Sequence, residues 1–153
     1  MENSPKPHAA AVIKGSANFP DITGVVRFYQ TRKGVLVRAE ISGLPTSQQP
    51  CARNIFGFHI HEGDSCTGNA ADPFADAKTH FNPTNCPHPA HAGDMPPLFG
   101  NDGLALLSFL TDRFSVAEVI GRTVVIHDMP DDFTSQPAGN SGTKIACGKI
   151  ETA

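Results

Sequence analysis

The sequence predicts an all-β domain, either an antiparallel sandwich or a barrel. Short runs of alternating apolar and polar residues recur along the chain, and turn-forming residues separate them. Glycine (14 residues) and proline (13 residues) are abundant, so turns and loops should be plentiful. With 153 residues the chain has the size of one domain that can bury a real core, and we treat residues 1–153 as a single domain.

The first 61 residues contain four predicted strands. Residues 11–19 form the first, which ends at Pro20-Asp21. Residues 22–30 form the second, because β-branched and aromatic residues dominate them, and Lys33-Gly34 supplies the following turn. Residues 53–61 form the fourth, an alternating apolar run with two histidines. Alternation is clearest in the third, residues 34–41, where one side of the strand carries Val35, Val37, Ala39 and Ile41.

The second part of the chain has fewer strands and two long loops. Residues 104–110, 122–127 and 145–150 read as strands, and residues 115–119 read as one helical turn. Residues 62–99 and 128–143 are rich in Gly, Pro, Asp and Asn and read as loops. Loops of this length in compact domains are usually functional or disordered. Since the first loop carries three histidines, we expect it to be functional.

Charge and hydropathy exclude several classes of protein. The net charge of −3 argues against non-specific binding of nucleic acid, which needs a basic surface. No apolar stretch approaches the roughly 20 residues of a membrane span. The segment from Met1 to Pro7 lacks the apolar core of a secretory signal. We therefore expect either a cytoplasmic protein or a processed secreted or periplasmic form, and the sequence does not separate the two.

Six of the seven histidines stand where a metal could collect them. His59 and His61 are two apart in a predicted strand, so their side chains point to the same side, about 6–7 Å apart along the strand. His127 ends another apolar run and could supply a third imidazole. Three or four imidazoles without thiolates suit copper, zinc or nickel, and a planar nitrogen set favours Cu(II).

A second set of candidate ligands lies in the first loop. It has the spacing His80-x7-His88-x2-His91-x2-Asp94. Three imidazoles and one carboxylate fill a four-coordinate site without an open position, which is how structural zinc is held. We expect metal binding to order this loop.

These residues also resemble a known family, the copper/zinc superoxide dismutases. Gly57-Phe58-His59-Ile60-His61-Glu62 resembles their copper-ligand strand, and Thr79-His80-Phe81-Asn82-Pro83 resembles their bridging-histidine segment. His91-Ala92-Gly93-Asp94 is similar to the end of their zinc loop. The segments Ile120–His127 and Gly139–Gly148 match as well, so the resemblance runs from about residue 11 to residue 150. The short spacing from His61 to Cys66 is more like the bacterial branch.

The resemblance implies a Greek-key antiparallel β-sandwich or flattened barrel of Ig-like architecture, with two long functional loops. It implies the dismutation of superoxide to oxygen and hydrogen peroxide, with copper and zinc as cofactors. A homodimer is compatible with it. Copper would be held by His59, His61, His80 and His127, and zinc by His80, His88, His91 and Asp94, so His80 would bridge the two ions.

Four further residues receive roles from the resemblance. Cys66 and Cys147 would form a disulfide between the long loop and the last strand. Asp131 would be the carboxylate that links ligand histidines of the two metals. His80 and Lys144 would be the catalytic residues, with Lys144 in a place where the family usually has arginine. A lysine keeps the positive charge that attracts an anion but loses the planar fork.

Two questions stay open from the sequence. Cys51 and Cys86 have no counterpart in the resemblance and could pair or be free thiols. The main alternative function is a non-catalytic metal-binding or structural member of the same fold, although all four copper-ligand positions are filled. A cupin-like enzyme is less compatible, because its motif expects a glutamate where Ser65 and Cys66 stand.

Overall fold

The computed structural model describes residues 4–153, so the first residues of the N-terminal segment discussed above lie outside the description. Nine strands account for most of the regular structure, with one short helix and one 3-10 turn. The helix α1 is Val116–Val119 and the 3-10 turn is Ala75–Ala77. The strands are β1 Ala9–Gly15, β2 Thr23–Thr31, β3 Gly34–Ser42, β4 Ile55–Phe56, β5 Phe58–His61, β6 Leu98–Phe99, β7 Ala105–Thr111, β8 Thr123–His127 and β9 Lys144–Thr152.

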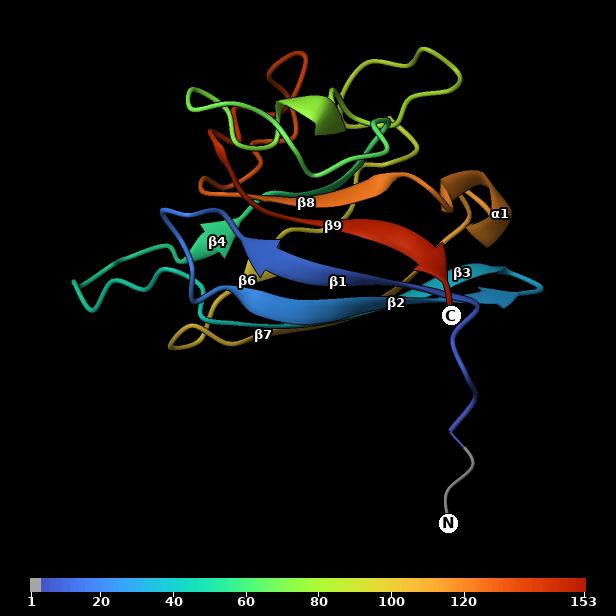
Figure 1. The fold of residues 1–153 in the computed structure, drawn as a ribbon, viewed down its shortest axis with the longest axis horizontal. Helices are drawn as coiled ribbons and strands as arrows, with labels where there is room; N and C mark the ends of the chain where they lie inside the picture. Colours follow the sequence, from blue (N-terminus) through green and yellow to red (C-terminus); the bar gives the residue numbers. More distant parts are fainter. Residues whose placement is uncertain (1–3) are drawn as a thin grey trace.

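Seven strands form one curled antiparallel sheet, in the order β5-β8-β9-β1-β2-β3-β7. Strands that are distant in sequence pair with each other, as β3 does with β7 and β1 with β9, which is Greek-key connectivity. The separate pair β4–β6 lies between the two ends of this sheet, because β4 runs on into β5 and β6 turns back into β7. The result is the flattened barrel that the sequence predicts, and the expected fold class is confirmed (Figure 1).

The core lies inside the curled sheet and is built by strand alternation. In β3 the side chains Val35, Val37 and Ile41 are fully buried, while Arg38 and Glu40 between them are exposed. The same alternation in β1 buries Ala11 and Ile13. Buried aliphatic and aromatic side chains from all the longer strands meet in one cluster. The alternation that predicts the strands therefore also gives the side that packs inward.

Strands β5 and β8 differ from the others because both of their faces are covered. Every residue of each strand is buried. Phe58 and Ile60 of β5 join the main core, so His59 and His61 point to the outer face. On that outer face Val125 of β8 packs with Phe74 and other residues of a second, smaller cluster. The long loops thus cover the one part of the sheet that carries histidines.

Three boundaries differ from the predicted ones for identifiable reasons. The first strand, predicted over residues 11–19, ends at Gly15 because the chain turns there, with the N–H of Phe19 donating to the carbonyl of Ser16 (2.9 Å). The strand predicted over residues 53–61 is divided at Gly57, whose N–H donates to the carbonyl of Met129 (2.9 Å) and whose carbonyl accepts from the N–H of His127 (2.8 Å). Part of the predicted first loop forms β6. The predicted helical turn is confirmed as α1, which begins with the N–H of Ser115 donating to the carboxylate of Glu118 (2.7 Å).

The two long loops lie together beyond β8, on the side of the molecule away from β7 (Figure 1). A disulfide between Cys66 and Cys147 ties the first loop to β9, as the resemblance implies. Cys51 and Cys86 are free thiols, the first exposed and the second partly buried. Among the described residues, no helix is long and apolar enough to cross a membrane.

The disulfide should stabilise the fold chiefly by restricting the unfolded chain. It closes a loop between residues that are 81 positions apart. Loop-closure entropy for a loop of this length is worth about 4 kcal/mol, so we expect Cys66→Ser/Cys147→Ser to lower the free energy of unfolding by about that amount. Denaturant titration of the metal-free protein measures it. The double variant Cys51→Ser/Cys86→Ser is the matched control and should unfold like the parent, and equal losses in both pairs would contradict the prediction.

Candidate metal centre

The strands β5 and β8 place three of the six histidines. His59 and His61 are two residues apart on β5 and point to the same outer face. His127 is the last residue of β8, which pairs antiparallel with β5, and its N–H bonds to Gly57 just before that strand. All three side chains are buried, between 0% and 4% exposed. The sheet therefore brings these imidazoles together under the loops.

Backbone hydrogen bonds fasten the first loop along β5 and bring in the other ligands. The N–H of Glu62 donates to the carbonyl of Thr79, and the N–H of Phe81 donates to the carbonyl of Ile60, both at 2.8 Å. The N–H of Ile60 donates to the carbonyl of Gly93, also at 2.8 Å. These bonds bridge His61 to His80 and His59 to Asp94 across short antiparallel pairings. Residues that are far apart in sequence are fixed beside the strand histidines in this way.

The first group that could hold a metal ion consists of four buried imidazoles, which we call the upper set: His59, His61, His80 and His127. One ligand atom of each lies within 4.8 Å of those of the others. The Nε2 atoms of His61 and His127 are 3.2 Å apart. This is the set that the sequence assigns to copper.

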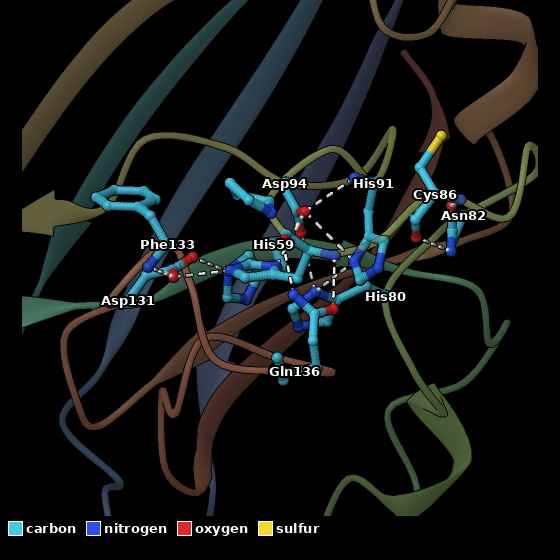
Figure 2. Close-up of polar contacts among 12 residues, drawn as sticks. His59, His80, Asn82, Cys86, His91, Asp94, Asp131, Phe133 and Gln136 are labelled. Carbon is cyan, nitrogen blue, oxygen red and sulfur yellow. Dashed lines mark hydrogen bonds and ion pairs between the residues drawn. The ribbon is translucent and has the colours of Figure 1, made fainter.

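The second group, which we call the lower set, consists of three imidazoles and one carboxylate: His80, His88, His91 and Asp94. Asp94 lies 2.9 Å from Nδ1 of His80, 3.0 Å from Nδ1 of His88 and 3.3 Å from Nδ1 of His91. Figure 2 shows Asp94 beside His80 and His91. The Nδ1 atoms of His80 and His91 are 3.2 Å apart. The Nδ1 atoms of all three rings therefore converge on the Asp94 carboxylate, and four converging ligand atoms are what a tetrahedral ion requires.

Asp131, from the second long loop, joins the two sets. Its carboxylate accepts a hydrogen bond from Nε2 of His59 (2.9 Å) and another from Nε2 of His88 (2.8 Å) (Figure 2). Burial disfavours the charged carboxylate, but the bonds from His59 and His88 outweigh it and hold the pKa of Asp131 well below its usual range. The anion fixes each ring as the tautomer protonated on Nε2, which leaves the Nδ1 lone pair free for a metal.

A main-chain carbonyl does the same for His61. Nδ1 of His61 lies 2.8 Å from the carbonyl of Lys78 and must donate to it. The Nε2 lone pair of His61 consequently faces His127. For a metal-binding ring, a donor bond on the outer nitrogen is the usual arrangement.

The hydrogen bonding of the buried rings shows that this site is suited to metal ions. Four buried ring nitrogens make no well-directed hydrogen bond: Nδ1 of His59, Nε2 of His80, Nδ1 of His88 (which lies 3.0 Å from a carboxylate oxygen of Asp94) and Nδ1 of His127. Leaving one buried polar atom unpaired costs about 1–3 kcal/mol, so four in a single cluster indicate a missing electrophile. Several imidazole nitrogens with one carboxylate form a donor set for copper and zinc.

Burial also keeps the rings in the protonation state that binds metal. It lowers the pKa of His59, His61, His91 and His127, because a charged ring is poorly solvated there, and nearby imidazoles add to the effect. The pKa values of His61 and His127 fall furthest. At neutral pH these four rings are uncharged and their lone pairs are available.

Lys144 lies where the resemblance implies but not in the state that we expect from the sequence. It lines a cavity of about 440 Å³ together with His61, His80 and His127. Its ammonium, however, is paired with the carboxylate of Asp72 at 2.7 Å. The sequence gives no signal for this partner, because Asp72 belongs to an irregular loop and the two residues are 72 positions apart.

Two further residues that hold the lower set are also absent from the sequence prediction. Gln136 pairs with the backbone of His88 through two bonds: its Oε1 accepts from the N–H (2.9 Å) and its Nε2 donates to the carbonyl (2.7 Å). Arg113 donates through Nη1 to the carbonyl of Pro89 (2.6 Å). Side-chain contacts to loop backbone follow no sequence period, so no pattern in the chain could have revealed them.

Comparison with known proteins shows which protein family has this fold and this set of histidines. The family described as copper/zinc superoxide dismutase (SODC) matches residues 22–150. The chain belongs to the copper/zinc superoxide dismutase family. Superoxide dismutase [Cu-Zn] 2 of Aquifex aeolicus is 36% identical over 145 residues, covering 85% of this chain and 80% of the relative. That of Deinococcus radiodurans is 36% identical over 148 residues, covering 85% and 78%.

A solved structure supports the fold. The Cu/Zn superoxide dismutase from Brucella abortus superposes with a TM-score of 0.77 at 24% identity, covering 94% of this chain and 99% of that chain. The relatives from Aquifex and Deinococcus are bacterial, in agreement with the bacterial spacing of residues 61–66, and Superoxide dismutase [Cu-Zn] A of Xenopus laevis is 35% identical over 159 residues, covering 93% of this chain and 95% of the relative. As a superoxide dismutase, the protein converts superoxide to oxygen and hydrogen peroxide with copper and zinc as cofactors. No observation favours a non-catalytic member of the fold.

Gly139 provides a test of the Asp131 bridge. A Cβ at this position would lie 2.0 Å from Oδ1 of Asp131 and 2.6 Å from Nε2 of His88. We expect Gly139→Ala to break the bond between these two residues and to weaken zinc binding by about 10–100-fold, the usual effect of losing such a partner. Competition with a chromogenic chelator measures the affinity.

The matched control is Gly121→Ala. Both glycines have a positive φ (71° and 88°), so both variants carry the same backbone strain of about 1–2 kcal/mol, but nothing lies within 4 Å of a Cβ at Gly121. Zinc affinity should stay at the parent value in this control. An equal loss in the two variants would show that strain, rather than the carboxylate bridge, governs binding.

The lowered pKa values predict the pH dependence of the metal-free protein. In the unfolded chain the four histidines titrate near 6.5, above their values in the fold. Below that pH the unfolded state binds more protons, so the free energy of unfolding falls as the pH drops from about 7 to about 5. The urea midpoint of the metal-free protein, measured across this pH range, tests the predicted loss of stability. A midpoint that stays constant or rises on acidification would contradict the lowered histidine pKa values.

Proposed function

We propose that the upper set holds the redox-active copper ion and the lower set holds the zinc ion of this dismutase. The observation that carries the assignment is the position of His80, which belongs to both sets. Its Nδ1 contacts Asp94 and His91 of the lower set, and its Nε2 has no partner within the protein. One ring therefore offers one nitrogen to each ion.

The two sets suit different chemical tasks. The lower set is closed by Asp94 and by the loop around it, which is typical of a structural ion. Three members of the upper set line the cavity, His61, His80 and His127, against His80 and His91 of the lower set, so the cavity opens mainly on the upper set. When bound, copper supplies the one-electron chemistry of the reaction, and zinc holds the other side of the shared ring.

The residues around the upper set have separate roles in this proposal. Nε2 of His80 is the atom that accepts a proton when it is not bound to metal and returns it toward the product. His59 and His61 stay oriented throughout, because Asp131 and the carbonyl of Lys78 hold their outer nitrogens. Lys78 adds positive charge to the wall of the cavity, which Lys144 also lines as a partner of Asp72.

The decisive experiment measures copper and zinc per chain together with superoxide consumption on the same sample. We expect two ions per chain and rapid consumption in the parent. His127→Ala removes one imidazole of the upper set only, so we expect it to lose copper and at least 100-fold of activity while it keeps zinc.

His91→Ala is the companion variant, because His91 belongs only to the lower set. It should lose zinc preferentially. Simultaneous loss of both ions in His127→Ala, measured by elemental analysis, would contradict the assignment of ions to sets.

The assignment of partners beyond the substrate is a further part of the proposal. The net charge of −3 favours neither nucleic acid nor an anionic membrane. We also propose that the protein forms a homodimer, with which the family resemblance is compatible. Equilibrium sedimentation at micromolar concentration tests it.

A further inference from the structure

The cation expected to attract the anionic substrate already has an anionic partner. Nζ of Lys144 lies 2.7 Å from Oδ2 of Asp72. The side chain of the lysine is 17% exposed and that of the aspartate is 40% exposed, so the pair is in contact with solvent at the cavity wall. Both residues line the cavity that contains His61, His80 and His127.

Asp72 is held in place by contacts that do not involve the lysine. Its Oδ1 accepts a hydrogen bond from the N–H of Phe74 (3.0 Å), and its own N–H donates to the side chain of Asn69 (2.9 Å). The disulfide between Cys66 and Cys147 ties the same loop to β9 three residues after Lys144. The carboxylate is therefore a fixed anchor, and the flexible lysine side chain comes to it.

The carboxylate is charged at neutral pH. Partial burial opposes ionisation, but the hydrogen bonds from Lys144 and from the N–H of Phe74 outweigh it and lower the pKa of Asp72. Among the residues that line this cavity, Asp72 carries the only carboxylate. Seen from an approaching anion, Lys144 with Asp72 is a dipole rather than a charge, and the pull of a dipole decays faster with distance.

We propose that Asp72 is a positioning residue for the dismutase reaction, which acts through Lys144. It anchors the ammonium, compensates its charge and so restrains the entry of anions to the upper set. The inference rests on the proposed function, because it takes the upper set as the place where the substrate reacts. Asp72 would then be a residue of the first loop that limits the rate of superoxide dismutation.

The test compares Asp72→Asn with Asp64→Asn. Asparagine keeps the acceptor for the N–H of Phe74 and replaces the oxygen that accepts from Lys144 with an NH2 group, so the charge and the bond to the lysine are lost together. Asp64 is an exposed acid of the same loop that does not line the cavity, so its variant makes the same change in net charge. We expect Asp72→Asn alone to raise kcat/KM for superoxide by about threefold at low ionic strength. The gain should fade above about 0.1 M salt, where the Debye length is roughly 10 Å.

Two additional measurements show whether Asp72 acts through Lys144. In a Lys144→Met background the gain from Asp72→Asn should be smaller than in the parent, because the change then removes only the repulsion from the carboxylate and releases no ammonium. Asp72→Glu in the parent should restore the parental rate. The affinity of the copper-loaded protein for azide, followed by absorbance, should rise in Asp72→Asn by a factor similar to that in kcat/KM. Azide titration needs no turnover, so it tests the role of Asp72 even if the parent consumes no superoxide. A parent that consumes no superoxide would refute the proposed function and not the role of Asp72.

The proposal is overturned by any of three results. The first is an Asp72→Asn variant whose kcat/KM and azide affinity equal or fall below those of the parent. The second is an equal gain in Asp64→Asn, which would mean that net charge alone matters. The third is a gain in the Lys144→Met background as large as that in the parent, which would mean that the carboxylate acts on the substrate directly and not through Lys144.

Discussion

The imidazole of His80 is the constraint on which the rest of the structure depends. One ring must present Nδ1 to a carboxylate-containing set and Nε2 to a set of imidazoles, and both directions are fixed by the plane of the ring. An error in its orientation would therefore disturb both sets together. The bonds between β5 and the loop around His80 are main-chain bonds on either side of the ring, so they fix its Cα directly. Strand β5, which supplies the ligands His59 and His61, therefore also positions the shared ligand His80.

Burial on both faces of β5 explains how so many imidazoles can be neutral and oriented at once. Desolvation removes the proton that would compete with a metal, while Asp131 and the carbonyl of Lys78 decide which nitrogen keeps its hydrogen. Neither effect suffices alone. A desolvated ring without an outer acceptor could place its hydrogen on either nitrogen, and an oriented ring in solvent would be protonated below about pH 6.5. The loops supply both conditions, since they exclude water and carry the acceptors.

The same arrangement has a cost for the fold. Without ions, four buried nitrogens make no well-directed hydrogen bond, and their desolvation opposes folding. The disulfide offsets part of this cost, because it ties the first loop to β9 whether or not ions are bound. The second loop has no such covalent tie, and Asp131 with Gln136 holds it to His88 through side-chain bonds. Binding of a metal ion to the lower set and ordering of both loops would consequently be coupled.

Much of the fold and of the ligand set could be predicted from the sequence, for two different reasons. Strand alternation fixes which side of residues 34–41 is buried, because a period of two leaves no other choice. The histidines of β5 follow from the same period. The residue types and spacing of the loop set predict one further metal site, but the sharing of His80 with the strand histidines follows only from the resemblance, since spacing gives no direction in an irregular segment. The break at Gly57 could not be predicted, because it depends on hydrogen bonds to Met129 and His127.

Charge is the property for which reading the sequence is least reliable. Counting Lys144 as a free positive charge requires knowing that nothing neutralises it, and that knowledge is spatial. The residues next to it in sequence, Thr143 and Ile145, are uncharged, yet the first loop places Asp72 against its ammonium from 72 residues away. Electrostatic attraction in a cavity depends on the residual field after all such pairs are formed. In this protein the field at the mouth of the upper set must therefore come from the bound ions and Lys78 more than from Lys144, and the lysine contributes only to the extent that a substrate anion can compete with a fixed carboxylate.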